Sequence, residues 1–444
     1  MELTISFTDK EISPWGGMAL MKKLVEKSKI LEKLREIKLP ESGSNRGYKS
    51  RDIIISFWLS IWCGANKFIH TEVTRQDKVM QQVYGLKSIP SHTTIKRFFN
   101  KFNLSRNNEI FTELYQWYFK QLEFDNYTLD FDSSVLTRYG EQEGAKRGYN
   151  PTKPGRKSHH PLMAFVSDIN MVANFWLRPG NTSATSNFFN FLEDTLLKLQ
   201  DKKIGLLRAD SGFYGENTFE YLENRDKPIN YIISARLYRP VKVAISRASK
   251  WLPVAPGIDI GEVEYKGKDW KKTRRMIIVR QSLKVRPNAS GKKLRLFEYE
   301  ELYENYRYSC FVTNLDLPCH QIWNIYKSRA NAENRIKELK YDFGFDSFNL
   351  NDFYATEAAL NFVMIAYNLM SLFIITVVNS PVAHRLSTLR YRLFAIGSYI
   401  IKDGNNKILK LSLAMKRREW FTGIWDKTKV FNLPVNLQYK FSNE

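Results

Sequence analysis

The chain has 444 residues, a hydrophobic fraction of 43% and an aromatic fraction of 14%, which together exclude a disordered protein and allow a substantial core. Its formal net charge is +22, and this excess indicates a polyanionic partner, with nucleic acid first and an anionic membrane surface second. Three cysteines are too few for a disulfide framework, so we expect reduced thiols and a cytosolic protein.

Two stretches bear on membrane targeting. The N-terminus is acidic and has no apolar run, which predicts that no signal peptide is present. Residues Ala358 to Val378 are apolar enough to cross a membrane, but Asn361 and Asn368 interrupt them. We therefore predict a buried core helix there, and no contact with a membrane.

Residues 1–115 are predicted to form an all-helical, DNA-binding region. The hydrophobic pattern indicates helices over Met18 to Ile37 and Ser50 to Cys63. A later helix starts after the N-cap Ser91 and carries Lys96 and Arg97 opposite an apolar side. That pattern suits the recognition helix of a helix-turn-helix unit, and an ordinary basic surface helix fits it equally well.

Residues 116–235 are predicted to form the first part of an α/β catalytic core. The pattern indicates three strands, a helix, a strand, a helix and a strand, which is the order of a ribonuclease-H-like fold, a mixed sheet flanked by helices. The predicted elements are the strands Tyr127 to Asp132, Pro161 to Val166 and Val172 to Leu177, the helix Asn187 to Leu199, the strand Ile204 to Ala209, the helix Glu216 to Glu223 and the strand Asn230 to Ala235.

Residues 236–308 are predicted to form a β-rich insertion. Prolines and glycines separate short β-type runs such as Met276 to Val279 and Leu294 to Phe297. Twelve Lys or Arg residues and one acid lie between Lys266 and Arg295, so the insertion has a basic face. Trp251 and Trp270 are candidates for stacking on a base, although packing in the core is the commoner role of a tryptophan.

Residues 309–380 complete the predicted core, and residues 381–444 are predicted to form a helical C-terminal region. One continuous helix is expected from Cys319 to Phe343. At about 100° per residue, four of its side chains share one stripe. These are Tyr326, Arg329, Glu333 and Lys340.

The fold order brings three carboxylates together. Asp132 ends the first core strand, Asp210 follows the fourth, and Glu333 lies on the later helix. Clustered carboxylates repel one another unless cations lie between them, and oxygen ligands favour Mg²⁺ or Mn²⁺. Two such ions about 4 Å apart would serve phosphoryl transfer. Asp130 shares a strand face with Asp132, so either aspartate could be the first ligand.

These residues resemble the DDE transposases of bacterial insertion sequences. The group with a Tyr-Arg-Glu-Lys signature is matched by Tyr326, Arg329, Glu333 and Lys340, with two, three and six intervening residues. The chain is most similar to insertion-sequence family 1380. That similarity rests on Trp15-Gly16-Gly17, Gly43-Ser44-Asn45-Arg46-Gly47-Tyr48, Trp62-Cys63-Gly64-Ala65-Asn66, Pro90-Ser91-His92, Gly148-Tyr149-Asn150-Pro151, Pro154-Gly155-Arg156, His160-Pro161-Leu162 and Arg208-Ala209-Asp210-Ser211-Gly212-Phe213.

The resemblance implies cut-and-paste transposition by a homodimer on double-stranded DNA, at terminal inverted repeats and target sites. It implies that Asp132, Asp210 and Glu333 are catalytic and hold two Mg²⁺ or Mn²⁺ ions; Ser133 and Ser134, as small hydroxyl residues, favour Asp132 over Asp130. The resemblance also implies that Tyr326, Arg329 and Lys340 bind phosphates near the cleaved end. Further DNA contacts are expected from Lys96, Arg97 and Trp270. Arg156, Lys157, His159 and His160 form a basic loop that could contact DNA, and a solvated turn fits that loop equally well.

A tryptophan of the insertion is expected to hold a flipped base, with Trp251 and Trp270 both open. Two alternatives to an active transposase are a transposase-derived DNA-binding regulator and a metal-dependent nuclease. The expected location is the bacterial cytoplasm, associated with the nucleoid.

Overall fold

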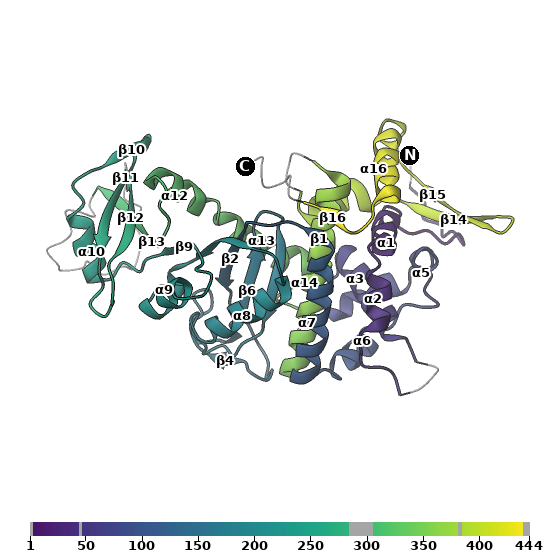
Figure 1. The fold of residues 1–444 in the computed structure, drawn as a ribbon. Helices are drawn as coiled ribbons and strands as arrows, with labels where there is room; N and C mark the ends of the chain where they lie inside the picture. Colours follow the sequence, from purple (N-terminus) through teal and green to yellow (C-terminus); the bar gives the residue numbers. More distant parts are fainter. Residues whose placement is uncertain (1–2, 44–46, 284–304, 381–383, 438–444) are drawn as a thin grey trace.

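The structure is a computed structural model that describes residues 3–43, 47–283, 305–380 and 384–437. Figure 1 shows a central group of strands and helices, with the strands of the insertion at one end and the N-terminal helices beside the C-terminal segment at the other. The strand predicted at Leu294 to Phe297 lies outside the described residues.

The N-terminal region is helical, as predicted, and its last helix runs into the core. Its elements are α1 Met18–Lys27, α2 Ile30–Glu36, α3 Ser50–Trp62, η1 Phe68–His70, α4 Thr71–Arg75, α5 Lys78–Tyr84, α6 His92–Phe99 and α7 Leu104–Lys120. The prediction of one helix from Met18 to Ile37 is wrong, because Lys29 has a left-handed backbone (φ 57°) that separates α1 from α2.

A nine-stranded mixed sheet runs through the central part and the insertion. Its order is β10-β11-β12-β13-β9-β8-β2-β6-β7. Strand β2 pairs antiparallel with β6 and parallel with β8, and β8 pairs parallel with β9. The strands are β2 Tyr127–Ser133, β6 Leu162–Val166, β7 Met171–Trp176, β8 Ile204–Ala209, β9 Tyr231–Ser234, β10 Leu252–Ala255, β11 Ile258–Tyr265, β12 Arg274–Ser282 and β13 Tyr306–Thr313.

The insertion extends the central sheet, since β13 pairs antiparallel with β9 and β12 with β13. One helix, α10 (Arg239–Ser246), precedes its strands. Helices α8 (Phe188–Leu199) and α9 (Glu216–Glu223) follow β7 and β8 in the chain. Short strands make two further small sheets around the core: β1 Leu122–Glu123 with β16 Val435–Asn436, and β3 Leu136–Thr137 with β5 Lys157–His159 and β4 Lys146–Arg147.

Successive residues of β2 face opposite sides of the sheet. Phe131 packs against Phe188 and Phe191 of α8, with ring centroids 5.2 and 5.8 Å away. Asp130 and Asp132 therefore face the other side, towards α12 (Cys319–Lys327) and α13 (Ala330–Phe343). The sheet thus has an aromatic face under α8 and, on β2, an acidic face under α12 and α13.

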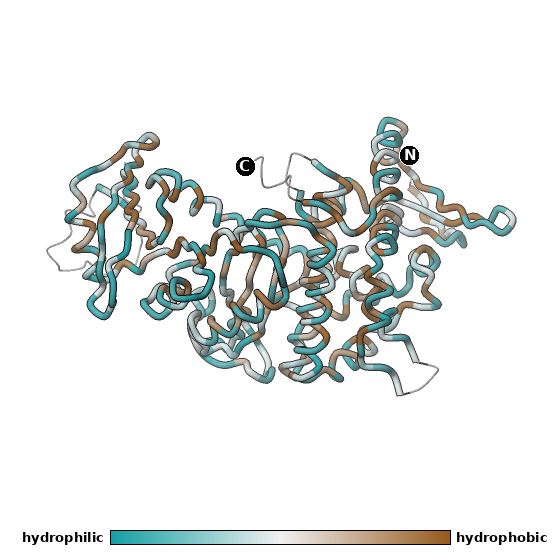
Figure 2. The backbone as a smooth tube through the Cα atoms, in the orientation of Figure 1, coloured by the Kyte–Doolittle hydropathy of each residue, from teal (hydrophilic) through white to brown (hydrophobic). Residues whose placement is uncertain are grey.

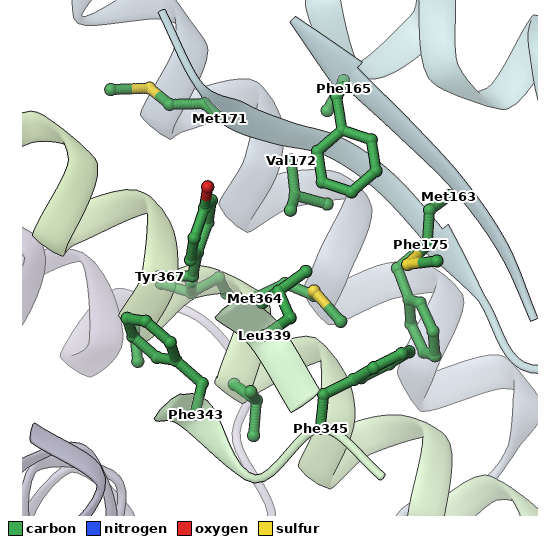
Figure 3. Close-up of a cluster of buried hydrophobic side chains, with 14 of the residues drawn as sticks. Met163, Phe165, Met171, Val172, Phe175, Leu339, Phe343, Phe345, Met364 and Tyr367 are labelled. Atoms are coloured by element: carbon green, nitrogen blue, oxygen red, sulfur yellow. The ribbon is translucent and has the colours of Figure 1, made fainter. Parts of the chain in front are cut away.

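Helix α14 (Phe353–Phe373), continued by a π-helical turn to Val378, is the central helix of the core. By length and composition the segment Phe353–Val378 could cross a membrane, but most of it is buried inside this structure, as the sequence predicted. Figure 3 shows Met364 and Tyr367 of α14 among side chains of β6, β7 and α13. Trp58 and Trp62 of α3 donate to backbone carbonyls of α14, at 2.8 and 3.2 Å. These contacts pack the N-terminal helices against the core.

The prediction of a helical C-terminal region is only partly right. Helices α15 (Leu386–Leu389) and α16 (Met415–Val430) are present, with a π-helical turn at Arg390–Phe394. Between them, β14 (Ser398–Asp403) and β15 (Asn406–Leu411) form an antiparallel hairpin. Its projecting tip is hydrophilic in Figure 2.

Candidate active site

The two predicted aspartates lie at the same edge of the sheet. Asp132 is near the end of β2, and Asp210 directly follows β8. Because β2 and β8 are parallel neighbours with Phe131 opposite Ala209, both carboxylates emerge at the carboxyl ends of the strands. Asp210 accepts a 2.8 Å hydrogen bond from the backbone N–H of Gly212, which anchors the turn that follows the strand.

The helix predicted from Cys319 to Phe343 is in fact two helices. The residues between α12 and α13 tighten into i to i−3 hydrogen bonds, from Arg329 to Tyr326 and from Ala332 to Arg329. Glu333 stands exposed on the first turn of α13, just after this junction. The break places Tyr326 and Glu333 on separate helices.

The charges of Asp210 and Glu333 act on the carboxyl group of Asp132. Asp132 is 7% exposed, and its pKa is raised to about 6, chiefly by burial. The charges of Asp210 and Glu333 raise this pKa further, while Arg329 and the backbone N–H of Ser133 lower it. Within the ranges that the structure describes, no group of three or more His, Cys, Asp or Glu side chains is assembled as a metal cluster. Asp210 and Glu333 are thus close enough to influence Asp132, although the three carboxylates are not assembled as a metal cluster.

Asp130 has a different environment from Asp132. It is fully buried, and Arg208 binds both of its oxygens, Nε to Oδ1 at 2.7 Å and an Nη to Oδ2 at 2.9 Å. An Nη of Arg335 lies 3.7 Å from Oδ2. These arginines occupy the carboxylate of Asp130, which favours Asp132 as the metal ligand.

The other three residues of the Tyr-Arg-Glu-Lys pattern contact the backbone next to the aspartates, on β8, on β2 and just after β2. Tyr326 donates to the carbonyl of Ala209 at 3.3 Å, and Lys340 to that of Val135 at 3.2 Å. Arg329 donates to the carbonyl of Phe131 at 3.0 Å and pairs with Asp132 at 3.3 Å. Two of these carbonyls belong to the residue just before a candidate ligand. These three side chains therefore face the sheet, with Tyr326 and Lys340 half-buried and Arg329 buried, while Glu333 is exposed. The single stripe predicted on one helix is divided between α12, the junction and α13.

Arg329 retains hydrogen-bonding capacity. It is 6% exposed, and its Nε is buried without a hydrogen-bond acceptor among the described residues. A buried donor without an acceptor costs free energy, so this Nε is a candidate to bind an anion such as a phosphate. The nearby charge of Asp132 helps to raise the pKa of Arg329 against the lowering effect of burial, which keeps the guanidinium charged.

His160 is a site residue that the sequence analysis placed in a DNA-contacting loop. It is buried, and its two ring nitrogens lie 2.7 Å from the carbonyl of Thr182 and 3.2 Å from the hydroxyl of Ser133. Since a carbonyl only accepts, Nδ1 carries the proton and Nε2 accepts from Ser133. Burial lowers the pKa of His160, which keeps the ring neutral. The position of His160 just before β6, the strand that pairs with the end of β2, is the sequence feature that could have predicted a place near Asp132.

The remaining residues that were predicted to contact DNA differ in their exposure to solvent. Lys96 and Arg97 are exposed on α6, and Arg156 is exposed in its loop, while His159 is buried and its pKa is lowered to about 4 by burial and by Arg138.

Trp270 does not fit the role predicted for it. It is 8% exposed and packs edge-on against Phe219 and Tyr265, so it belongs to the aromatic core. Trp251 is half-buried, and the guanidinium of Arg280 lies 4.1 Å from its ring centroid. Of the two tryptophans left open by the sequence, Trp251 is the one nearer the surface.

A family model described as Transposase DDE domain group 1 matches residues 1–430. The chain belongs to the DDE transposase family. No curated protein sequence matches this transposase. Among solved structures it is similar to one described as the piggyBac transposase synaptic complex with hairpin DNA, at 13% identity over 86% of this chain and 81% of that chain, with a TM-score of 0.46.

DDE transposases generally use divalent metal ions. The donors of this transposase fit such ions, because Asp132, Asp210 and Glu333 offer hard oxygen ligands and mutual repulsion that a cation would relieve. Their role as ligands stays a prediction.

Proposed function

We propose that this chain is a cut-and-paste transposase of insertion-sequence family 1380, working in the bacterial cytoplasm. It hydrolyses phosphodiester bonds at terminal inverted repeats and joins the freed 3′ ends to target DNA. The observation that carries the proposal is the placement of Asp132, Asp210 and Glu333, two at the ends of parallel neighbouring strands and one beside them on α13. The strand order β7-β6-β2-β8-β9 supports a ribonuclease-H-like core.

In this proposal Asp132, Asp210 and Glu333 hold two Mg²⁺ or Mn²⁺ ions, which supply activation of the attacking oxygen and charge stabilisation at the leaving oxygen. Arg329 is proposed to contact a phosphate, since its buried Nε has no hydrogen-bond acceptor in the part of the chain that the structure describes. Tyr326 binds the backbone at the end of β8, and Lys340 binds the backbone just after β2, so both lie beside the candidate ligands. Together these side chains bind and orient the backbone of the DNA at the sheet edge.

The wider DNA surface is proposed from charge. Lys96 and Arg97 on α6 and Arg156 near the core are exposed, and the net charge of +22 suits a long duplex bound by a homodimer. Trp251 replaces Trp270 as the residue proposed to stack on a flipped base, because only the former reaches the surface.

The test is DNA cleavage by the Glu333→Gln variant. The substrate is a DNA fragment that contains the coding sequence together with its flanking DNA, where the terminal inverted repeats are expected. Glu333 is exposed, so the fold should persist, while loss of a metal ligand removes several kcal/mol of transition-state stabilisation. We expect cleavage to fall more than about 100-fold, with DNA binding retained. Glu32→Gln, an exposed change of the same charge on α2, should cleave like the wild type.

The other functions give different results in the same assay. Cleavage by Glu333→Gln at the wild-type rate would contradict the proposed site. Wild-type protein that binds the end DNA without any metal-dependent nicking would be a regulator. Cleavage without joined products in the strand-transfer assay would indicate a nuclease.

A further inference from the structure

Arg208 is a buried arginine on β8, two residues before Asp210. It is 3% exposed, and its Cα pairs with that of Asp130 across the parallel strands β2 and β8. A fully buried guanidinium is costly unless each of its donors is satisfied. The hydrogen-bond acceptors of Arg208 therefore indicate the role of this side chain.

All five N–H donors of the guanidinium have an acceptor. Nε and one Nη bind the two oxygens of Asp130, and the second hydrogen of that Nη reaches the hydroxyl of Ser167 at 2.9 Å. The other Nη donates to the carbonyl of Ile325 and to the hydroxyl of Ser328. A guanidinium offers five donors in a fixed planar fork, so these acceptors determine its orientation.

The acceptors come from the segments that carry the candidate ligands. Asp130 is two residues before Asp132 on β2, and Arg208 itself is two residues before Asp210. Ile325 lies in the last turn of α12, and Ser328 lies at the junction five residues before Glu333. One side chain thus joins β2, β8 and the α12–α13 junction.

We infer that Arg208 is a positioning residue that sets the distances among Asp132, Asp210 and Glu333, and hence the affinity of this site for divalent metal ions. The inference rests on the proposed function. Because all the donors of Arg208 bind acceptors of the protein itself, it acts by fixing the two strand ends and the start of α13 relative to one another. Its cationic Nη also lies at the C-terminal end of α12, where carbonyls lack helical partners and positive charge is favourable.

The Arg208→Lys variant would keep the positive charge but lose the planar set of five guanidinium donors. Its single ammonium has three donors at one point and cannot reach Asp130, Ser167 and the junction together. Arg335 cannot take over this role, because it donates to Asn170 and to the backbone carbonyl of Ser167 and stands 3.7 Å from Asp130.

The experiment measures Mn²⁺ binding to the full chain by the electron paramagnetic resonance signal of free Mn²⁺, together with thermal unfolding. In Arg208→Lys we expect the affinity for Mn²⁺ to fall about tenfold or more, as for other residues that orient metal ligands. In Ser328→Ala, where one exposed hydroxyl is removed, we expect a loss of about threefold. DNA cleavage by Arg208→Lys should show a lower kcat with KM unchanged.

Arg274→Lys is the matched control. Arg274 is also a buried strand arginine, 3% exposed in its side chain, and it binds Glu216 and Glu223 of α9, neither of which is a candidate metal ligand. It should lower thermal stability as Arg208→Lys does and leave Mn²⁺ affinity unchanged. Because Arg208 and Ser328 act through one bond, Ser328→Ala should weaken Mn²⁺ binding no further in the Arg208→Lys background.

The outcomes separate the inference from the proposed function. Wild-type protein that neither binds Mn²⁺ nor nicks DNA would overturn the proposed function and this inference with it. Wild-type protein that binds Mn²⁺, with Arg208→Lys equal to Arg274→Lys in affinity, would overturn this inference alone. If Arg208→Lys does not fold, wild-type Mn²⁺ affinity in Ser328→Ala would overturn it.

Discussion

Glu338 on α13 is a carboxyl group whose ionisation works against folding. Its pKa is raised to about 7, chiefly by burial, and the charge of Asp342 raises it further. Arg385, Arg390 and the backbone N–H of Leu386, which donates to Glu338 at 2.9 Å, oppose the rise. At neutral pH this side chain is close to its midpoint of ionisation, so its protonation affects stability.

The sign of the pH dependence follows from the raised pKa. The stabilising contribution of protonated Glu338 is fully present below its ordinary pKa of 4.5 and is lost as the pH rises through about 7. Glu338→Gln keeps a neutral acceptor for Leu386, so at pH 8 we expect it to be more stable than the wild type by about 1–3 kcal/mol. At pH 4.5 the two should unfold alike.

Urea unfolding at the two pH values measures this difference. Glu419→Gln, on an exposed turn of α16, serves as the control and should change stability by less than about 0.5 kcal/mol at either pH. A stability gain in Glu338→Gln that is the same at pH 4.5 and pH 8 would contradict the assigned ionisation.

At the scale of elements, the C-terminal end of α13 is a close contact between the central core and the N-terminal helices. Gly344 caps α13 with a left-handed backbone (φ 68°), and its Cα faces the backbone of Asn66. A Cβ at this position would lie 2.7 Å from the Cα of Asn66. The glycine is therefore required by both the backbone conformation and the close approach of the loop after α3.

Gly344→Ala combines two costs that a matched variant can separate. Gly85 caps α5 with nearly the same backbone (φ 65°), and a Cβ added to Gly85 would meet no atom within 4 Å among the described residues. We expect Gly85→Ala to destabilise by about 1 kcal/mol through backbone strain, and Gly344→Ala by about 2–4 kcal/mol because the two regions must also move apart. Thermal and urea unfolding measure the loss of stability in each variant. Equal losses of stability in the two variants would show that the backbone around Asn66 can move to accommodate the added Cβ without a loss of free energy.

A comparison of predicted and observed elements shows which parts of the fold could be predicted from the sequence. Alternating and apolar runs predicted β2, β6, β7, β8 and β9 to within about a residue at each end, and hence the shared edge of Asp132 and Asp210. The break at Ser328 was not predictable, since the segment has helical periodicity and its hydroxyl binds Arg208 from a strand 120 residues earlier. The burial of Trp270 likewise depends on tertiary partners that no local pattern contains. The β14–β15 hairpin is different, because its two strands pair with each other across the turn at Gly404 (φ 57°), a local signal that the prediction of a helical region missed.

At the scale of the whole molecule, the N- and C-terminal segments lie together at one end. Ser13 and Trp15 of the N-terminal segment form bridges with Ser398 and Ile396. Figure 1 shows α6 within this end, and the insertion with β10–β12 at the opposite end of the sheet. A duplex held by both α6 and the sheet edge would run along much of the protein, so its binding should involve many phosphates.

That geometry makes the salt dependence of DNA binding a test of α6. Each phosphate contact contributes about 0.9 to the slope of log K against log salt. If α6 is a recognition helix, removing both cations in Lys96→Ala/Arg97→Ala should reduce the slope by about 2, measured by fluorescence anisotropy between about 50 and 200 mM salt.

The control is Lys22→Ala/Lys23→Ala on α1, where both lysines pair with Glu26. It removes the same charge, so a general effect of net charge would lower both slopes equally. A slope that changes only with α6 would identify that helix as a phosphate-binding surface, whereas equal slopes in both variants would leave it an ordinary basic helix.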